Sequence, residues 1–217
     1  ELNLYISADY LKMVSSVRVA PSINIKLYIM LALVLFFVIG CCGAVLLGRM
    51  SDIVDYLLYV DKKTGLPNRE KLNIYIGEMA GKVLPEAFTC FTLNLDNLSE
   101  LTKRFGYTVG DGVLKYFAGL VQLMGDTEGM RGYNGIGRFV VFFEECSSKK
   151  AAAMIRILDN QVEEYNSLNP EYPIRYTAAW ATTEETDTYE IRELLRLSQK
   201  KWKQMEKEKK DKTEEET

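Results

Sequence analysis

The sequence predicts a mixed α/β (α+β) domain that follows one membrane-spanning helix, and three observations lead to this prediction. Residues 27–48 form an apolar run of about 22 residues without a charge. From Asp61 onward, apolar runs rich in aromatic and β-branched residues alternate with segments of helical periodicity. The stretch YNGIGRFVV at 133–141 places Asn-Gly between two β-prone runs, which is a strong hairpin signal.

The apolar run at 27–48 is long enough to cross the hydrocarbon layer of a bilayer, about 30 Å, as a single helix. Its length and internal position argue against a cleaved signal peptide. The alternative is a buried helix of a soluble protein. More Lys and Arg residues follow the run than precede it, which favours a cytoplasmic C-terminal part. With this orientation, 1–26 is expected to be an extracytoplasmic segment. Because the first residue is Glu1 and not methionine, we expect it to be the end of a longer external region.

Residues 49–60 have the pattern of an amphipathic linker helix that leaves the membrane. Ile53, Leu57 and Val60 recur at helical spacing on one of its faces. Such a face suits two arrangements equally well. It can pair with a second copy of the chain to form a homodimer, or it can pack on the domain that follows.

The composition limits the chemistry that the chain can perform. Its 217 residues are 47% hydrophobic, enough for one domain with a core and an additional segment. The net charge of −3 gives no electrostatic footprint for nucleic acid. The chain has no histidine, so it lacks the commonest near-neutral acid–base group and metal ligand. The spacing of its four cysteines fits neither a zinc site nor a disulfide framework.

The order of elements after the linker follows from periodicity and turn signals. The expected helices are 70–79, 98–105, 110–124, 148–168 and 189–208, and the expected strands are 88–96, 129–133, 139–145 and 174–183. The globular domain is thus expected at 61–208. The chain ends in a charge run at 209–217, which we expect to be a fraying helix end and a solvated tail.

Two polar positions are expected to meet at one edge of the sheet. The strand at 88–96 ends in the residues LNLD at 93–96, and the hairpin tip lies at 135–138. Carboxylates at both places would converge on divalent cations, which stabilise the attacking and departing oxygens of nucleotidyl transfer. Glycines at the tip would let a triphosphate approach the backbone. The tip here offers two glycines, an isoleucine and an arginine, but no carboxylate.

From Asp61 to about Glu208, the order of segments resembles the GGDEF family, the diguanylate cyclases that condense GTP into cyclic di-GMP. The stretch DKKTGLPNRE at 61–70 looks like the family's opening motif D-x-L-T-G-L-x-N-R, with Lys63 in place of a leucine. The stretch LNLDNLSELTKRFGYTVGDGVL at 93–114 is similar to its D-x-D-x-F-K-x-x-N-D-x-x-G-H-x-x-G-D-x-x-L segment.

Two further segments complete the resemblance. GIGRFVVFF at 135–143 stands where the family has its namesake signature, and ELLRLSQKKW at 193–202 looks like its closing helix. The resemblance implies a nucleotidyl-cyclase-like fold, with a central, mostly antiparallel sheet flanked by helices. It also implies a bacterial protein whose GGDEF-like domain lies in the cytoplasm, behind the membrane-spanning helix.

The chain departs from the family at the metal-binding positions. The first metal-binding aspartate falls on Asn94, and the acidic pair of the signature falls on Gly137 and Arg138. Magnesium prefers carboxylates and phosphate oxygens in an octahedral arrangement. A divalent ion about 4 Å from a guanidinium is repelled by roughly 8 kcal/mol at an effective dielectric constant of about 20. Asp96 fits the motif without occupying the first ligand position. We therefore expect no catalytic residue, no metal ligand, and neither GTP nor Mg²⁺ as a cofactor.

The guanine-binding positions are also altered. The guanine-reading asparagine of the family falls on Thr102 and the neighbouring aspartate on Lys103, so that only the second contact, Asp111, is retained. Thr102 and Asp111 are therefore the candidate guanine contacts. Asp111 also follows Gly110 at the expected start of a helix, so helix N-capping explains it as well as guanine binding does.

Other family contacts are largely absent. The closing phosphate contacts fall on Glu206, Lys209 and Lys210, which leaves only a lysine for an arginine. The inhibitory R-x-x-D site would fall on Asp126 and Gly129. Arg138 at the hairpin tip is either a solvated side chain or a direct phosphate contact that replaces the metal.

These observations favour a membrane-anchored, catalytically inactive GGDEF-like domain that acts as a signalling or protein-interaction module in cyclic di-GMP signalling. One alternative is a nucleotide-sensing domain that binds GTP without turnover, and another is an active cyclase with atypical metal ligands. A fourth hypothesis rests on VRVAPSINIKLYIM at 17–30, which is similar to the end of polysaccharide chain-length determinant proteins and would imply a polysaccharide-export partner. The lipid membrane is the expected partner in all four.

Overall fold

The computed structural model describes residues 24–125 and 129–215. The chain divides into two compact units, residues 1–53 and residues 54–217. Most of the predicted extracytoplasmic segment lies outside the described residues, and so does half of the stretch that resembles polysaccharide chain-length determinants. The predictions for those segments therefore stay predictions.

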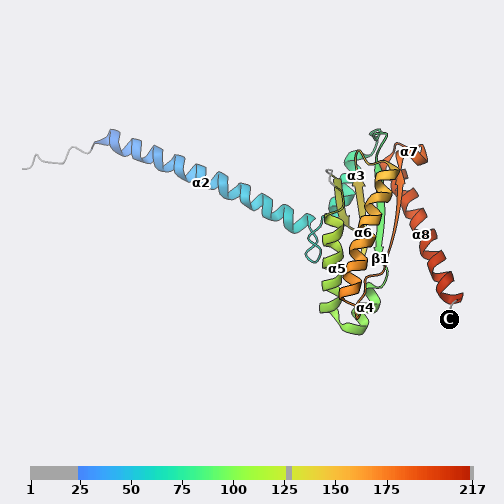
Figure 1. Cartoon of the computed structure of the whole chain (residues 1–217). Coiled ribbons are helices and arrows are strands. Elements are labelled where there is room, and N and C mark those ends of the chain that lie inside the picture. The colour runs from blue at the N-terminus through green and yellow to red at the C-terminus, as the bar shows by residue number, and fades with distance from the viewer. Residues whose placement is uncertain (1–23, 126–128, 216–217) are drawn as a thin grey trace, which may run out of the picture. The chain divides into compact units, whose positions relative to one another are not determined.

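The first described element is the long helix α2, Ile25–Tyr59, which has 35 residues (Figure 1). It is long and apolar enough to cross a membrane, and its apolar window is not buried inside the protein. The side chains of Phe36 and Phe37 are exposed over most of their surface. The predicted span and the predicted linker are parts of this one uninterrupted helix.

The second unit is built on a four-stranded sheet in the order β2-β3-β1-β4. Its strands are β1 (Thr89–Leu95), β2 (Gly129–Tyr133), β3 (Arg138–Phe143) and β4 (Tyr176–Thr182). All three neighbouring pairs are antiparallel. The prediction of a mostly antiparallel sheet is thus confirmed, and the hairpin predicted at 129–133 and 139–145 forms with its second strand at 138–143.

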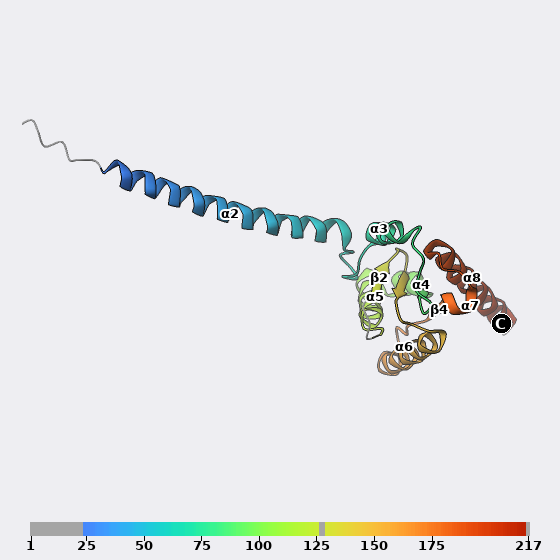
Figure 2. The same cartoon turned by 90° about the horizontal axis from the view of Figure 1, so that it is seen from above.

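Helices cover both faces of the sheet (Figure 2). The helices are α3 (Arg69–Met79), α4 (Leu98–Phe105), α5 (Tyr107–Gln122), α6 (Ser148–Leu168), the short α7 (Thr183–Thr186) and α8 (Ile191–Glu215). Helices α4, α5 and α6 pack on one face, and α3 and α8 pack on the other. The architecture is a helix–sheet–helix sandwich.

The alternation of side chains along β1 produces two cores. Phe91, Leu93 and Leu95 point into the larger core with α5 and α6. Cys90 points into the smaller core, where burial raises the pKa of its thiol to about 12 and keeps it neutral. β1 is therefore buried on both faces, which agrees with its apolar, β-branched sequence.

A buried polar cluster joins α8 to β1. The hydroxyl oxygens of Thr92 and Ser198 lie 2.8 Å apart, and Ser198 also lies 3.4 Å from the sulfur of Cys90. Ser198 further donates to the carbonyl of Leu195 at 3.0 Å. Because each buried polar group has a partner, this cluster fixes the position of α8 without a desolvation penalty.

The opening motif forms a turn before α3. One carboxylate oxygen of Asp61 accepts hydrogen bonds from the backbone N–H and the hydroxyl of Thr64, both at 2.9 Å. Asn68 caps α3 by accepting from the N–H of Lys71, and its amide donates to the carbonyl of Leu58 at 2.7 Å. These residues brace the turn that leads into the domain.

Two predicted helix boundaries differ from the structure by three residues or more. The helix expected from 110 begins at Tyr107, because the chain re-enters a helix directly after Gly106, which has a φ of 87°. Asp111 therefore lies in the second turn of α5, and the N-capping interpretation of this residue is wrong. The last helix does not end at 208 but continues to Glu215, so the predicted tail at 209–217 is helical over most of its length.

Candidate functional site

The candidate site lies where β1 ends beside the β2–β3 turn. In the register of the sheet, Asn94 of β1 lies opposite Arg138 of β3 and, on its other side, opposite Thr177 of β4. Directly opposed residues of antiparallel strands project their side chains on the same face of the sheet. The three residues therefore form one row across the sheet, on the face that α8 covers.

The β2–β3 turn has an unusual backbone. Gly135, Ile136 and Gly137 have φ values of 83°, 52° and 73°, all in the left-handed region. The carbonyl of Gly137 accepts a hydrogen bond from the N–H of Leu95 at 2.8 Å, which ties the turn to the end of β1. The N–H of Arg138 closes the turn on the carbonyl of Gly135 at 3.0 Å.

This backbone disfavours a carboxylate at position 137. A Cβ atom on Gly137 would lie 3.1 Å from the carbonyl oxygen of Leu95, tighter than ordinary contact, and its φ suits glycine. The position where the family has the first acidic residue of its signature is thus a glycine in a conformation that disfavours any side chain. The second position, Arg138, brings a positive charge instead.

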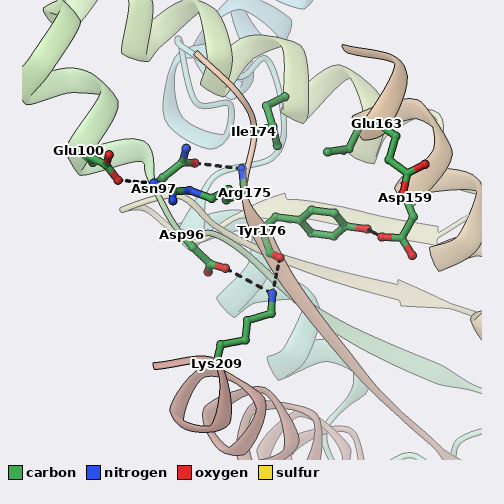
Figure 3. A pocket seen from close by; sticks show the side chains of 10 residues that line it. Asp96, Asn97, Glu100, Asp159, Glu163, Ile174, Arg175, Tyr176 and Lys209 are labelled. Atoms are coloured by element: carbon green, nitrogen blue, oxygen red, sulfur yellow. Dashed lines mark hydrogen bonds and ion pairs between the residues drawn. The ribbon is translucent and has the colours of Figure 1, made fainter. Parts of the chain in front are cut away.

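Asp96, the remaining carboxylate, is bound within the chain (Figure 3). One of its oxygens accepts from the amide of Asn94 at 2.8 Å, and the other accepts from the hydroxyl of Thr177 at 2.6 Å. The ammonium of Lys209 lies 3.8 Å from the second oxygen. Lys209 itself donates to the Tyr176 carbonyl and the Thr177 hydroxyl, both at 2.8 Å.

Arg138 rests on an aromatic ring of α8. Its guanidinium carbon lies 5.6 Å from the centre of the Trp202 ring, within the range of a cation–π contact. Trp202 is 6% exposed, and its indole N–H has no hydrogen-bond partner in the described part of the chain. The ring therefore gives Arg138 a fixed support, while the arginine itself remains exposed.

These residues do not fit a magnesium ion. Among the residues that the structure describes, no three carboxylate, thiol or imidazole side chains lie close enough to hold a metal. The row presents an amide, a guanidinium and a hydroxyl, and the nearby Asp96 already has a lysine as its counter-ion. Magnesium binding requires carboxylate and phosphate oxygens, which this row does not supply.

A cavity of about 480 Å³ lies beside the row. Cationic, acidic, neutral polar and apolar side chains line it: Asn94, Leu95, Asp96, Leu98, Ser99, Thr102, Lys103, Tyr107, Ile136, Arg138, Trp202 and Glu206. Thr102 thus reaches the cavity, and its hydroxyl donates to the Leu98 carbonyl at 2.8 Å. Gly110 packs closely on Thr102, since an added Cβ would lie 2.2 Å from that hydroxyl oxygen.

Asp111, the other candidate guanine contact, is engaged elsewhere. Its carboxylate forms an ion pair with the ammonium of Lys63 at 2.8 Å, and both side chains are about half exposed. The hydrogen bond from this ammonium to Asp111 raises the pKa of Lys63. Lys63 stands where the family has a leucine. Asp111 does not belong to the cavity lining, so the structure does not bring it together with Thr102 around that cavity.

A second cavity, of about 580 Å³, was missed by the sequence analysis (Figure 3). It is lined by Asp96, Asn97, Glu100, Asp159, Val162, Glu163, Ile174, Arg175, Tyr176 and Lys209. The Tyr176 hydroxyl donates to Asp159 at 2.5 Å, and burial together with this bond raises the pKa of Tyr176. Since these residues come from four segments far apart in sequence, no local pattern could have indicated this cavity.

Comparison with known proteins places the chain in one family. The family described as "Diguanylate cyclase, GGDEF domain" matches residues 58–212, more than half of the chain. Among curated proteins, none matches the chain.

Three solved structures show the same fold. The coiled coil and GGDEF domain of DgcB from Caulobacter crescentus is 14% identical, with a TM-score of 0.63, over 77% of this chain and 91% of that one. A diguanylate cyclase/phosphodiesterase from Caldicellulosiruptor saccharolyticus is 18% identical, with a TM-score of 0.57, over 71% and 91%. The Pseudomonas aeruginosa cyclase SiaD, solved with its activator SiaC, is 15% identical, with a TM-score of 0.50, over 91% and 79%. Taken with the match over residues 58–212, the antiparallel sheet and the turn at its edge show that this chain belongs to the GGDEF family of diguanylate cyclase domains.

Proposed function

We propose that the chain is a membrane-anchored, catalytically inactive member of the GGDEF family that acts as a signalling or protein-interaction module. One observation carries the proposal: Arg138 lies opposite Asn94 at the end of β1, where the family gathers carboxylates around metal ions. An active site of this class needs two divalent ions to stabilise the attacking and departing oxygens. A guanidinium at this position opposes the first ion instead of binding it.

The counter-ion of Asp96 supports the same proposal. In place of a mobile divalent ion, the chain supplies Lys209, tethered on α8 and held by Tyr176 and Thr177. A tethered ammonium balances the carboxylate but has no open coordination position for a phosphate oxygen or a water molecule. Asp96 therefore has a structural role in this proposal, as the link between β1, β4 and α8.

The proposed anchor is the N-terminal part of α2, in a bacterial cell membrane with the GGDEF domain in the cytoplasm. The large apolar side chains at 53–58, including Ile53 and Leu57, are about half exposed, which supports a partner such as a second copy on the segment 49–60. The similar cyclase SiaD was solved with a protein activator. A partner protein is therefore a reasonable expectation for this chain, and its output is expected in cyclic di-GMP signalling.

A turnover assay tests the proposal. The purified full chain is incubated with GTP and either Mg²⁺ or Mn²⁺, and cyclic di-GMP is quantified by mass spectrometry. We expect no product above that of an Asp96→Asn variant, which serves as the matched control. Product formation by the wild type that this variant lacks would instead show an active cyclase with atypical ligands.

A second candidate function is nucleotide binding without turnover. The cavity of about 480 Å³ beside Arg138 and Lys103 supports it, because arginine binds phosphate groups well. Calorimetry with GTP in the absence of divalent ions separates the candidates. Saturable binding that is weakened by Arg138→Ala but not by Asp111→Ala would support a binding site in this cavity. Loss on Asp111→Ala would support the guanine contact, and no heat would remove nucleotide binding.

A further inference from the structure

Helix α8 carries five basic residues in one row. Arg192, Arg196, Lys200, Lys203 and Lys207 follow one another at intervals of three or four residues, so they lie on one side of the helix. All five side chains are exposed. We refer to these five residues as the basic stripe. At a rise of about 1.5 Å per residue, it extends over about 22 Å.

The opposite side of α8 is the one that packs on the sheet. Ile191, Leu194, Ser198 and Trp202 are buried there, and Lys209 reaches Asp96 from this side. Figure 1 shows α8 along the edge of the domain. The basic stripe therefore faces away from the sheet, on a rigid helix whose orientation is fixed by its buried side.

Most of the stripe has no counter-ion among the residues that the structure describes. Arg196 pairs with Glu193, whereas the other four cations form no ion pair with any residue of the described chain. Other cations of α8 are used internally, since Lys201 pairs with Glu185 and Lys209 with Asp96. In a chain with a net charge of −3, four unpaired cations on one helix face are a local excess of positive charge.

We propose that the basic stripe docks on the anionic headgroups of a lipid bilayer. A straight row of long, flexible cations on an outward helix face suits an extended negative surface better than a pocket-sized ligand. The inference rests on the proposed anchoring, because α2 would hold the domain beside a bilayer. Each basic residue near an anionic leaflet strengthens attachment by about 1 kcal/mol, or about fivefold.

Energy transfer from tryptophan tests this inference on the full chain. Both tryptophans, Trp180 and Trp202, lie in the domain rather than in α2. The chain is placed in nanodiscs that contain a dansyl-labelled lipid, either in phosphatidylcholine alone or with phosphatidylglycerol added. We expect stronger transfer with phosphatidylglycerol, and we expect high salt to remove the difference.

Two charge-reversal variants sharpen the test. The triple variant K200E, K203E and K207E should lower the ratio of docked to undocked domain by about 100-fold, at about fivefold or more per residue. The matched control reverses three exposed lysines on other faces, K82E, K115E and K149E, and should keep the transfer of the wild type. Circular dichroism checks that both variants are folded.

The outcomes separate the inference from the proposal on which it rests. Equal transfer in neutral and anionic nanodiscs overturns the docking, as does an equal loss in both variants. The docking to lipid is also overturned if an added polyanion such as heparin binds the stripe while phosphatidylglycerol has no effect. A chain that does not purify with nanodiscs at all contradicts the anchoring and overturns the inference with it.

Discussion

At the scale of single residues, Lys209 and Asp96 explain how the end of the sheet tolerates an isolated carboxylate. The side chain of Asp96 is 27% exposed and accepts two hydrogen bonds besides the ion pair with Lys209. The lysine in turn has acceptors on β4. Because each polar group has a partner, the cluster is satisfied without an external ion.

The first prediction follows from this cluster. Lys209→Met removes two hydrogen bonds to β4 and the counter-ion of Asp96, so the free energy of unfolding should fall by about 1 kcal/mol. Urea unfolding of the full chain in detergent, followed by tryptophan fluorescence, measures it. Lys207→Met, on the basic stripe, is the control and should change stability by less than about 0.5 kcal/mol. If Lys209→Met lowered the free energy of unfolding no more than Lys207→Met does, the contacts of Lys209 would not contribute to stability.

At the scale of elements, the β2–β3 turn is defined by its backbone conformation. Three consecutive residues adopt left-handed backbone angles, and only the middle one, Ile136, carries a side chain. This side chain is 85% exposed, so it has almost no packing to offset the strain. The turn is kept by the hydrogen bond between Gly137 and Leu95 of β1 and by the bond between Arg138 and Gly135, rather than by the residue at its tip.

A second prediction tests this strain. Ile136→Asn places at the tip a residue that tolerates the left-handed region, so the free energy of unfolding should rise by about 1 kcal/mol. Chemical denaturation of wild type and variant gives the difference. The control is Ile157→Asn. Ile157 is exposed like Ile136 but lies within the regular helix α6, so the same change there should not raise the free energy of unfolding. A gain at both positions would point to hydrophobicity instead of backbone strain.

The short helix α7 links its neighbours through Glu185. The Ser148 hydroxyl at the start of α6 donates to this carboxylate, and Lys201 of α8 lies 3.3 Å from it. The hydrogen bond from Ser148, followed by Lys201, lowers the pKa of Glu185 below its ordinary value. Because the folded-state pKa is the lower one, this contribution to stability is present above the unfolded pKa and lost as the pH falls.

The third prediction is therefore a pH dependence. The free energy of unfolding of wild type should exceed that of Glu185→Gln near neutral pH, and the difference should shrink as the pH falls from the ordinary pKa of a glutamate through the lowered pKa of the folded state. Unfolding curves at several pH values measure it. Glu164→Gln, at an exposed position on α6 that forms no ion pair with the described residues, should show no such trend. A difference that persists in acid would contradict the assigned charge interaction.

At the scale of the whole molecule, local patterns predicted most of the elements. Helix α6 and strand β2 have the predicted ends, and α4 was also predicted correctly. Periodicity and turn residues act within a few residues of each other, so they can be recognised in the sequence. The start of α5 was predicted at Gly110, but the helix begins at Tyr107 and Gly110 lies inside it, where it provides room for Thr102.

The candidate site was predictable only in part. The resemblance to the family placed Asn94 near the turn, and the register of β1 and β3 brings it opposite Arg138. Asp96 pairs with Lys209, 113 residues further along the chain (209 − 96). Lys63 pairs with Asp111, 48 residues further along (111 − 63). Both pairs depend on tertiary packing between distant segments. No local pattern contains such information.

The central claim is that this chain cannot gather a divalent ion where its relatives in the family do so. Titration of the full chain with Mn²⁺, followed by the electron paramagnetic resonance of free Mn²⁺ with and without GTP, tests it most directly. We expect wild type and Asp96→Asn to leave the same amount of Mn²⁺ free, and we expect Asn94→Asp, Arg138→Glu and Lys209→Met together to create a saturable site. Saturable binding by wild type that is lost in Asp96→Asn would contradict the account.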